Sequence, residues 1–203
     1  MSSPPRTRAD RLHLLHRVDT ARRAATLLRS KEEALEREQD RVAGHLARAT
    51  SDWAAALGTA TSLLARARAL GASGELDRWV RTLPATATAA PTWQVSMGVS
   101  YPTAVACTPG PRPDLTTTAA LGPAADAYAA ALSAAATAAG AALAQRRLDR
   151  ELAETRRRRR AVEDRLLPEL EDTCRRLELH LDELDREEAQ RVRTAVRIRE
   201  GGR

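Results

Sequence analysis

The stretch LLHRVDTARRAATLLRSKEEALEREQDRVAGHL, Leu14 to Leu46, repeats its apolar residues in alternating steps of four and three. A mean step of 3.5 residues is typical of helices that pair in a left-handed coiled coil. The repeat continues to Leu70 and contains only two polar members, Glu32 and Gln39. It therefore predicts one long N-terminal helix. Its members are Leu14, Val18, Ala21, Ala25, Leu28, Glu32, Leu35, Gln39, Val42, Leu46, Ala49, Trp53, Ala56, Ala60, Leu63, Ala67 and Leu70.

The composition agrees with paired helices rather than with a compact globule. The 203 residues include no Phe, two Tyr and three Trp, and alanine is the commonest apolar residue. Alanine has the highest helix propensity, and its small side chain lets two helices approach closely. Because 30% of the residues are also charged, long helices with one apolar stripe are expected.

The N-terminal helix is expected to end at Gly71 and Gly74, because glycine commonly terminates helices. From about Leu83 to Pro113 the composition changes to proline, threonine, glycine and β-branched residues. The run from Trp93 to Cys107 has β-forming residues on both sides of a glycine, which predicts a short hairpin. Pro102, which lies in this run, can be accommodated only in an edge strand. The predicted hairpin residues are Met97, Gly98, Val99 and Pro102.

A second long helix is expected to begin between Leu115 and Ala125 and to run to about Arg199. Its apolar stripe has an average step nearer 3.6, which implies weak supercoiling. Two long helices joined by a compact turn region would pack antiparallel. The stripe passes through Leu148, Leu152, Thr155, Arg159, Val162, Leu166, Leu170, Cys174, Leu177, Leu181 and Leu184.

The predicted fold class is therefore all-α: a long antiparallel two-helix coiled coil with a small Pro/Thr-rich hairpin insert between the helices. Three domains follow from this organisation. Residues 1–75 form the N-terminal coiled-coil helix, residues 76–118 the insert, and residues 119–203 the C-terminal coiled-coil helix. Deleting Pro84 to Pro111 is expected to leave the helices folded.

Five consecutive arginines, residues 156–160, lie within the second helix. Because they cover more than one helical turn, they cannot all point to the solvated side of a two-helix pair, and Arg159 falls on the apolar stripe. Pro168 follows eight residues after the last arginine. A proline inside a helix removes one backbone hydrogen bond and costs about 3 kcal/mol. It predicts a bend in the helix at this point.

The sequence gives no sign of catalytic or metal-binding chemistry. A P-loop requires Gly-Lys-Ser/Thr, but the only lysine is Lys31, which lies within the heptad helix. The pairs His13/His16 and Cys174/His180 lack the further ligands that zinc needs. We therefore expect no catalytic residue, no cofactor and no metal.

Charge, cysteine content and hydropathy limit the location and the partners. A net charge of +6 permits an anionic partner without identifying one. Cys107 and Cys174 have no partner at redox or metal-binding spacing, which favours a reducing cytoplasm. The alanine-rich stretch from Ala119 to Ala144 contains Asp126, and alanine contributes little to transfer into lipid. No membrane insertion is expected.

The C-terminal half resembles the signature of the D subunit of the V-type and archaeal-type rotary ATPases. That signature has two basic residues, an Ala-Leu-Glu triplet, a mid-helix proline, and then Leu-Asp-Glu before alternating charges. The matching residues are Thr155, Arg157, Arg158, Ala161, Val162, Glu163, Leu166, Leu167, Pro168, Leu170, Thr173, the run Leu181–Glu187 and Arg191.

The N-terminal half is similar to the same family, and the predicted hairpin fits the family's central hairpin. Three positions depart from the pattern: Ala24 replaces a glycine, Glu32 a basic residue and Arg160 an asparagine. The stretch Leu115–Ala144 matches by length and position only. The matching N-terminal residues are Thr7, Arg8, Arg17, Ala21, Leu27, Leu28, Lys31 and Leu35.

The resemblance implies a noncatalytic central rotor shaft, which transmits torque between a catalytic ring and a proton- or sodium-translocating membrane ring. The implied partners are the catalytic and noncatalytic ring subunits, the F subunit and the funnel-shaped adaptor on the membrane ring. The complex would be cytoplasmic and peripheral to the cell membrane. Pro168 would give the shaft an asymmetric curve. The arginines that would face acidic loops of the ring are Arg156, Arg157, Arg158 and Arg160.

The arginine block also fits a second class of protein, a basic coiled-coil scaffold or a nucleic-acid-binding structural protein. This alternative predicts DNA affinity that falls steeply with salt and is abolished when residues 156–160 are neutralised. The shaft hypothesis predicts stable assembly with ring subunits instead. The sequence leaves open the transported ion and the direction, synthesis or hydrolysis, in which the complex works.

Overall fold

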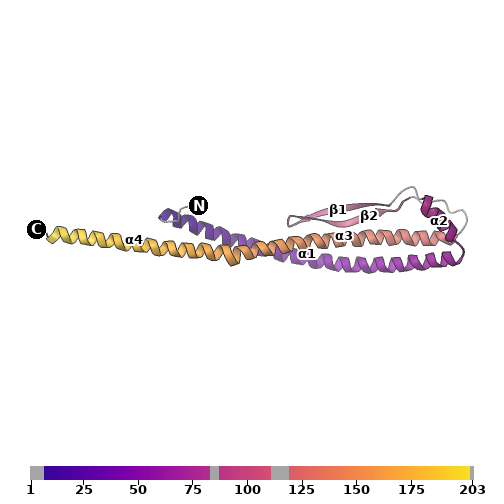
Figure 1. The fold of residues 1–203 in the computed structure, drawn as a ribbon, viewed down its shortest axis with the longest axis horizontal. Coiled ribbons are helices and arrows are strands. Elements are labelled where there is room, and N and C mark those ends of the chain that lie inside the picture. Colours follow the sequence, from indigo (N-terminus) through magenta and orange to yellow (C-terminus); the bar gives the residue numbers. More distant parts are fainter. Residues whose placement is uncertain (1–6, 83–86, 111–118, 202–203) are drawn as a thin grey trace. The chain divides into compact units, whose positions relative to one another are not determined.

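The computed structural model describes residues 7–82, 87–110 and 119–201. The prolines at 84, 111 and 113 lie outside the described residues. In chain order the elements are α1 (Arg8–Ala69), α2 (Ser73–Thr82), β1 (Thr88–Ser96), β2 (Val99–Thr108), α3 (Leu121–Arg160), the π-helical turn η1 (Ala161–Leu166) and α4 (Leu167–Gly201) (Figure 1). The prediction of long helices with a small hairpin between them is confirmed. The interlocked packing of a coiled coil stays a prediction.

The chain divides into two compact units. Unit 1 comprises Met1–Glu32 and Glu154–Arg203, and unit 2 comprises Glu33–Ala153. The three domains predicted from the sequence stay a prediction.

In unit 2, α1 and α3 pack side by side in opposite directions. Leu35, near the start of this part of α1, clusters with Leu148, near the end of α3. Ala67, near the end of α1, clusters with Leu121 at the start of α3. Gln39, a polar member of the stripe, has a hydrogen-bond partner on the other helix: its Nε2 donates to Asp149 Oδ1 at 2.6 Å.

The end of α1 forms a Schellman motif around Gly71. Gly71 has a φ of 89°, its N–H donates to Arg68 O at 3.0 Å, and Ala72 N–H donates to Ala67 O at 3.1 Å. A left-handed glycine with these two bonds satisfies the last carbonyls of the helix. The predicted end at Gly71 is confirmed. The expectation for Gly74 is wrong, because Gly74 lies inside the ten-residue helix α2.

The hairpin is confirmed and is longer than predicted, from Thr88 to Thr108. Ser96 pairs with Val99, so Met97 and Gly98 alone make the turn. Their φ angles, 51° and 82°, are the positive values that a type I′ turn requires. Thr103 is the unpaired residue of a bulge beside Pro102. In a two-stranded sheet both strands are edges, as Pro102 requires.

The hairpin belongs to the core of unit 2 and lies along α3 (Figure 1). Val99 and Tyr101 are buried in the same cluster as Leu35 and Leu148. Arg147 Nη1 of α3 donates to Ser100 O at 2.9 Å. Its guanidinium carbon also lies 4.9 Å from the centroid of the Trp93 ring. The hairpin is therefore fixed to the helices by apolar, hydrogen-bonding and cation–π contacts.

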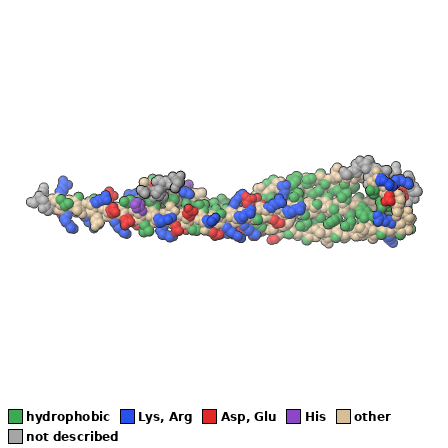
Figure 2. All heavy atoms as spheres, viewed as in Figure 1, with side chains coloured by type: hydrophobic (Ala, Val, Ile, Leu, Met, Phe, Trp, Pro, Cys, Tyr) green, Lys and Arg blue, Asp and Glu red, His purple; other side chains and the backbone are tan. Residues whose placement is uncertain are grey.

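In unit 1, α1 and α4 also run in opposite directions. Three ion pairs join them: Arg8 to Asp185 at 2.8 Å, Arg11 to Glu178 at 2.9 Å and Arg22 to Glu171 at 2.7 Å. Residue numbers therefore increase along α1 in the direction in which they decrease along α4. These exposed pairs each stabilise little. The underlying cluster contains Leu14, Val18, Ala21, Leu170 and Leu177. Figure 2 shows charged side chains of both signs along this unit and apolar ones gathered over the hairpin of unit 2.

Four stripe residues predicted to pack are exposed: Trp53 by 39%, Leu70 by 72%, Leu166 by 38% and Leu184 by 42%. Trp53 lies near Ala49 and Asp52, which border a groove together with Ala134 of α3. This part of α3 is rich in alanine. Helices that approach closely through alanine leave no space to enclose an indole ring. Leu70 follows the last residue of α1 and lies in the turn.

The helical run Leu121–Glu200 contains an 18-residue window with a mean hydropathy of 1.4, of which 28% is buried. By length and composition alone, this helix could cross a membrane. Alanine contributes little to transfer into lipid. The expectation that the chain does not insert into a membrane stays a prediction.

Candidate functional site

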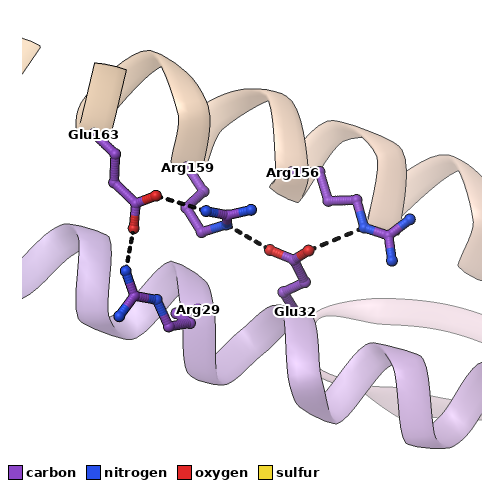
Figure 3. Close-up of polar contacts among 5 residues, drawn as sticks. All are labelled: Arg29, Glu32, Arg156, Arg159 and Glu163. Atoms are coloured by element: carbon purple, nitrogen blue, oxygen red, sulfur yellow. Dashed lines mark hydrogen bonds and ion pairs between the residues drawn. The ribbon is translucent and has the colours of Figure 1, made fainter. Parts of the chain in front are cut away.

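Two arginines of the block, Arg156 and Arg159, belong to a network of ion pairs inside unit 1 (Figure 3). Glu32 of α1 accepts from Arg156 Nε at 2.9 Å through one carboxylate oxygen and from Arg159 Nε at 2.7 Å through the other. Arg159 Nη1 also donates to Glu163 Oε2 at 2.5 Å, and Arg29 Nη2 donates to Glu163 Oε1 at 2.7 Å. We call these five residues, Arg29, Glu32, Arg156, Arg159 and Glu163, the polar layer.

The two carboxylates of the polar layer are largely shielded from solvent, and their pKa values favour the ionised form. The side chain of Glu32 is only 12% exposed and that of Glu163 only 19%. Burial raises the pKa of Glu32, but hydrogen bonds from Arg159 and Arg156 outweigh it, so the pKa is lowered. For Glu163, burial is likewise outweighed by hydrogen bonds from Arg29 and Arg159, and the pKa is lowered. Hydrogen bonds to Glu32 and then to Glu163 raise the pKa of Arg159.

Acid is expected to weaken unit 1 through these carboxylates. A lowered pKa means that the folded state binds fewer protons than the unfolded state, so stability rises with pH. The contribution is fully present above the ordinary value of 4.5 and is lost as pH falls through the folded-state pKa. Urea denaturation between pH 7 and pH 3 should show the midpoint falling below about pH 5.

The variant Glu32→Gln should flatten this pH dependence because its amide does not titrate. The matched control is Glu33→Gln, which changes the exposed neighbour on the same helix and should leave the wild-type profile intact. An identical profile in wild type and Glu32→Gln would contradict the assignment.

The other arginines of the block have different surroundings. Arg158 pairs with Glu154 on its own helix. Arg157 and Arg160 are exposed, and neither forms an ion pair with another residue in the described part of the chain. Of the four arginines expected to contact a ring, Arg156 and Arg158 thus already bind carboxylates of this chain. Arg159 lies in the helix interface, as the stripe predicts.

The helix changes its phase at η1, immediately before Pro168. The stripe residue before the turn, Thr155, is 1% exposed, and steps of four and three from it would reach positions 166, 169, 173 and 176. The structure buries Leu170, Cys174 and Leu177 instead. Each of them comes one residue later than expected. The turn therefore acts as a one-residue insertion, and Leu167 N–H donates to Val162 O in the π pattern.

This insertion explains why the stripe prediction failed at Leu166. Leu166 is exposed, whereas Leu167 packs against the apolar cluster of unit 1. The average step near 3.6 is one local phase change rather than a gradual drift. The bend expected at Pro168 stays a prediction.

The remaining site predictions concern metals and thiols. Within residues 7–82, 87–110 and 119–201, no group of three or more His, Cys, Asp and Glu side chains could hold a metal ion. Cys107 and Cys174 are free thiols. The expectation that the protein works without a metal or cofactor stays a prediction.

Sequence reasoning missed two members of the polar layer, Arg29 and Glu163. The available signal was the placement of Glu32 and Arg159 on opposite apolar stripes. Charges at such positions require a partner.

In the described part of the chain, long helices pack in pairs, a hairpin docks on one of them, and many charged side chains are paired with each other. The family model for the D subunit of ATP synthase matches residues 11–197. The chain belongs to this family, and no curated protein matches it. It is a central-stalk subunit of a rotary ATPase rather than the catalytic subunit. As such it is a component of a membrane-associated complex for ATP synthesis and ion transport.

Proposed function

We propose that the chain is the rotor shaft of its complex and transmits torque between the catalytic ring and the membrane ring. ATP turnover in one ring would thereby be coupled to proton or sodium movement in the other. The observation that carries this proposal is the family match over residues 11–197. The antiparallel helix pairs within each unit support it, because two packed helices resist twisting better than one.

The proposed partners are the catalytic and noncatalytic ring subunits, the F subunit at the side and the funnel-shaped adaptor on the membrane ring. The proposed location is the cytoplasmic side, peripheral to the membrane. Arg157 and Arg160 are the best candidates for ring contacts, because they are exposed. Arg156 and Arg158 would first have to release Glu32 and Glu154.

The test is reconstitution with the ring subunits and a probe attached to the chain. Rotation of the probe after ATP addition is expected. Failure of the chain to assemble with the ring would overturn the proposal.

The double variant Arg157→Gln/Arg160→Gln should weaken assembly by about tenfold and reduce its salt dependence, because exposed charges act mainly on association. The matched control is Arg37→Gln/Arg66→Gln, which removes the same charge from two exposed positions of α1. Titrations at two salt concentrations measure both effects. Equal losses in both variants would count against a specific ring contact.

The arginine block also favours the alternative of a basic scaffold that binds nucleic acid. Ion pairs to Glu32 and Glu154 already occupy three of the five arginines, Arg156, Arg158 and Arg159. Tight DNA binding that disappears with Arg157→Gln/Arg160→Gln, together with no ring assembly, would favour this alternative.

A further inference from the structure

We propose that η1 and the polar layer form a torsional joint inside unit 1, at which α4 turns about its own axis relative to the end of α3. The resting position of this joint is set by the ion pairs of the layer.

The regular α-helical hydrogen bonding of the backbone is interrupted at this point of the helix. A π turn interrupts the i→i−4 hydrogen-bond pattern of the α-helix around it, and such single turns occur frequently at functional sites. Pro168 adds a missing donor, since it has no N–H. No residue of η1 is buried. Segments with few buried contacts and weak hydrogen bonds open at the lowest free energy.

The contacts at this level tolerate rotation better than a packed core would. The polar contacts between α1 and this part of the chain are made by Arg29, Glu32, Arg159 and Glu163, whose side chains have several rotatable bonds. Within the turn, Val162 packs against the apolar cluster of unit 1. An apolar core holds side chains in fixed rotamers, and displacing them creates voids. Long ionic side chains can follow a turning helix while they stay paired.

At two of the arginines of α1, Arg22 and Arg29, the paired carboxylate is followed in the sequence by a second acidic residue. Arg29 binds Glu163, and the next residue is Asp164. Arg22 binds Glu171, and the next residue is Asp172. One residue corresponds to about 100° of helix rotation. The second carboxylate therefore lies about 100° further around the helix. A turn of α4 by that whole angle would carry Leu170 and Leu177 out of the apolar cluster of unit 1, so the joint turns through a smaller angle and keeps its existing ion pairs.

The joint is a property of the chain itself. Its meaning for torque, as a compliant element that stores twist between steps, rests on the proposed shaft function.

Hydrogen exchange on the full-length chain tests the joint directly. Amides 162–167 are expected to exchange at least about tenfold faster than those of the uninterrupted turns at 171–177, and faster still in about 0.5 M NaCl, which screens the polar layer. The variant Pro168→Ala restores a donor and should slow this exchange.

Deleting Asp164 should abolish the joint without unfolding the protein. It removes the extra residue, so Leu170, Cys174 and Leu177 fall into heptad phase with Thr155 in a continuous α-helix. Exchange at the site should then slow to the rate of the flanking turns, with Tm unchanged or higher.

Deleting Asp172 is the matched control, because it removes an exposed aspartate from an uninterrupted α-helical turn. Either Leu167 and Leu170 or Cys174 and Leu177 must then leave the face toward α1, so Tm should fall. Equal protection of η1 and its flanks, or equal Tm losses from the two deletions, would overturn the joint. These measurements use the chain without ring subunits. The joint can therefore be disproved while rotation is observed, and the shaft function can be disproved while the joint is observed.

Discussion

Replacing Tyr101 with alanine is expected to lower the free energy of unfolding by about 3–5 kcal/mol, the usual loss for a large buried aromatic side chain. Tyr101 is fully buried and joins the hairpin to Leu35 and Leu148 of the helix pair. Its hydroxyl donates to Glu38, which also pairs with Arg41. The substitution would leave both a cavity and a carboxylate with one donor fewer. Urea denaturation followed by circular dichroism measures the loss.

Tyr101→Phe is the control, because it keeps the ring and removes only the hydroxyl. A loss of about 1.5 kcal/mol is expected, the scale of one hydrogen bond to a charged group. If the alanine and phenylalanine variants were equally stable, the ring would not be part of the core. The same packing argues against the expectation that the helices stay folded without residues 84–111, because that deletion removes Val99 and Tyr101 from their cluster.

The second large effect is expected from Gly140→Val on α3. A Cβ at position 140 would lie 2.5 Å from Val105 Cγ2 of the hairpin, far inside van der Waals contact. Valine has a stiff side chain and cannot swing away. We expect a loss of about 1–3 kcal/mol, as for other overpacked sites. Thermal denaturation and hydrogen exchange of β2 would show the hairpin loosening first.

Gly58→Val is the matched control, since Gly58 also lies in a helix interior and nothing approaches its Cβ position within 4 Å. Valine has a somewhat higher helix propensity than glycine, so stability should change by only a few tenths of a kcal/mol. Combining Gly140→Val with Val105→Ala should recover part of the loss. Equal effects at positions 58 and 140 would show that helix propensity, and not the hairpin contact, decides the result.

The heptad pattern was sufficient to predict the helix pairs and to single out their polar members. Glu32 and Gln39 interrupt the stripe of α1, and both bind partners across the helix pair. The hairpin was also readable from the residues around Met97 and Gly98, because glycine there permits the turn.

Local features of one or two residues were harder to predict. The adjacent leucines Leu166 and Leu167 fit two phases of the same helix equally well, so the pattern could not reveal the π turn between Ala161 and Leu166. Helix α2 was missed because its ten residues follow a glycine-rich turn and carry a stripe too short to stand out. The exposure of Trp53 depends on the small side chains of the helix opposite it. The repeat of the N-terminal helix alone carries no information about those side chains.

The π turn η1 affects how this chain must be compared with any relative whose helix is uninterrupted. An alignment with a family member whose helix is uninterrupted has to open a one-residue gap between Arg160 and Leu167. Without that gap, each inward-facing position from Leu170 onward is matched to a surface position of the relative. Residue preferences derived from such an alignment would then be assigned to the wrong side of α4.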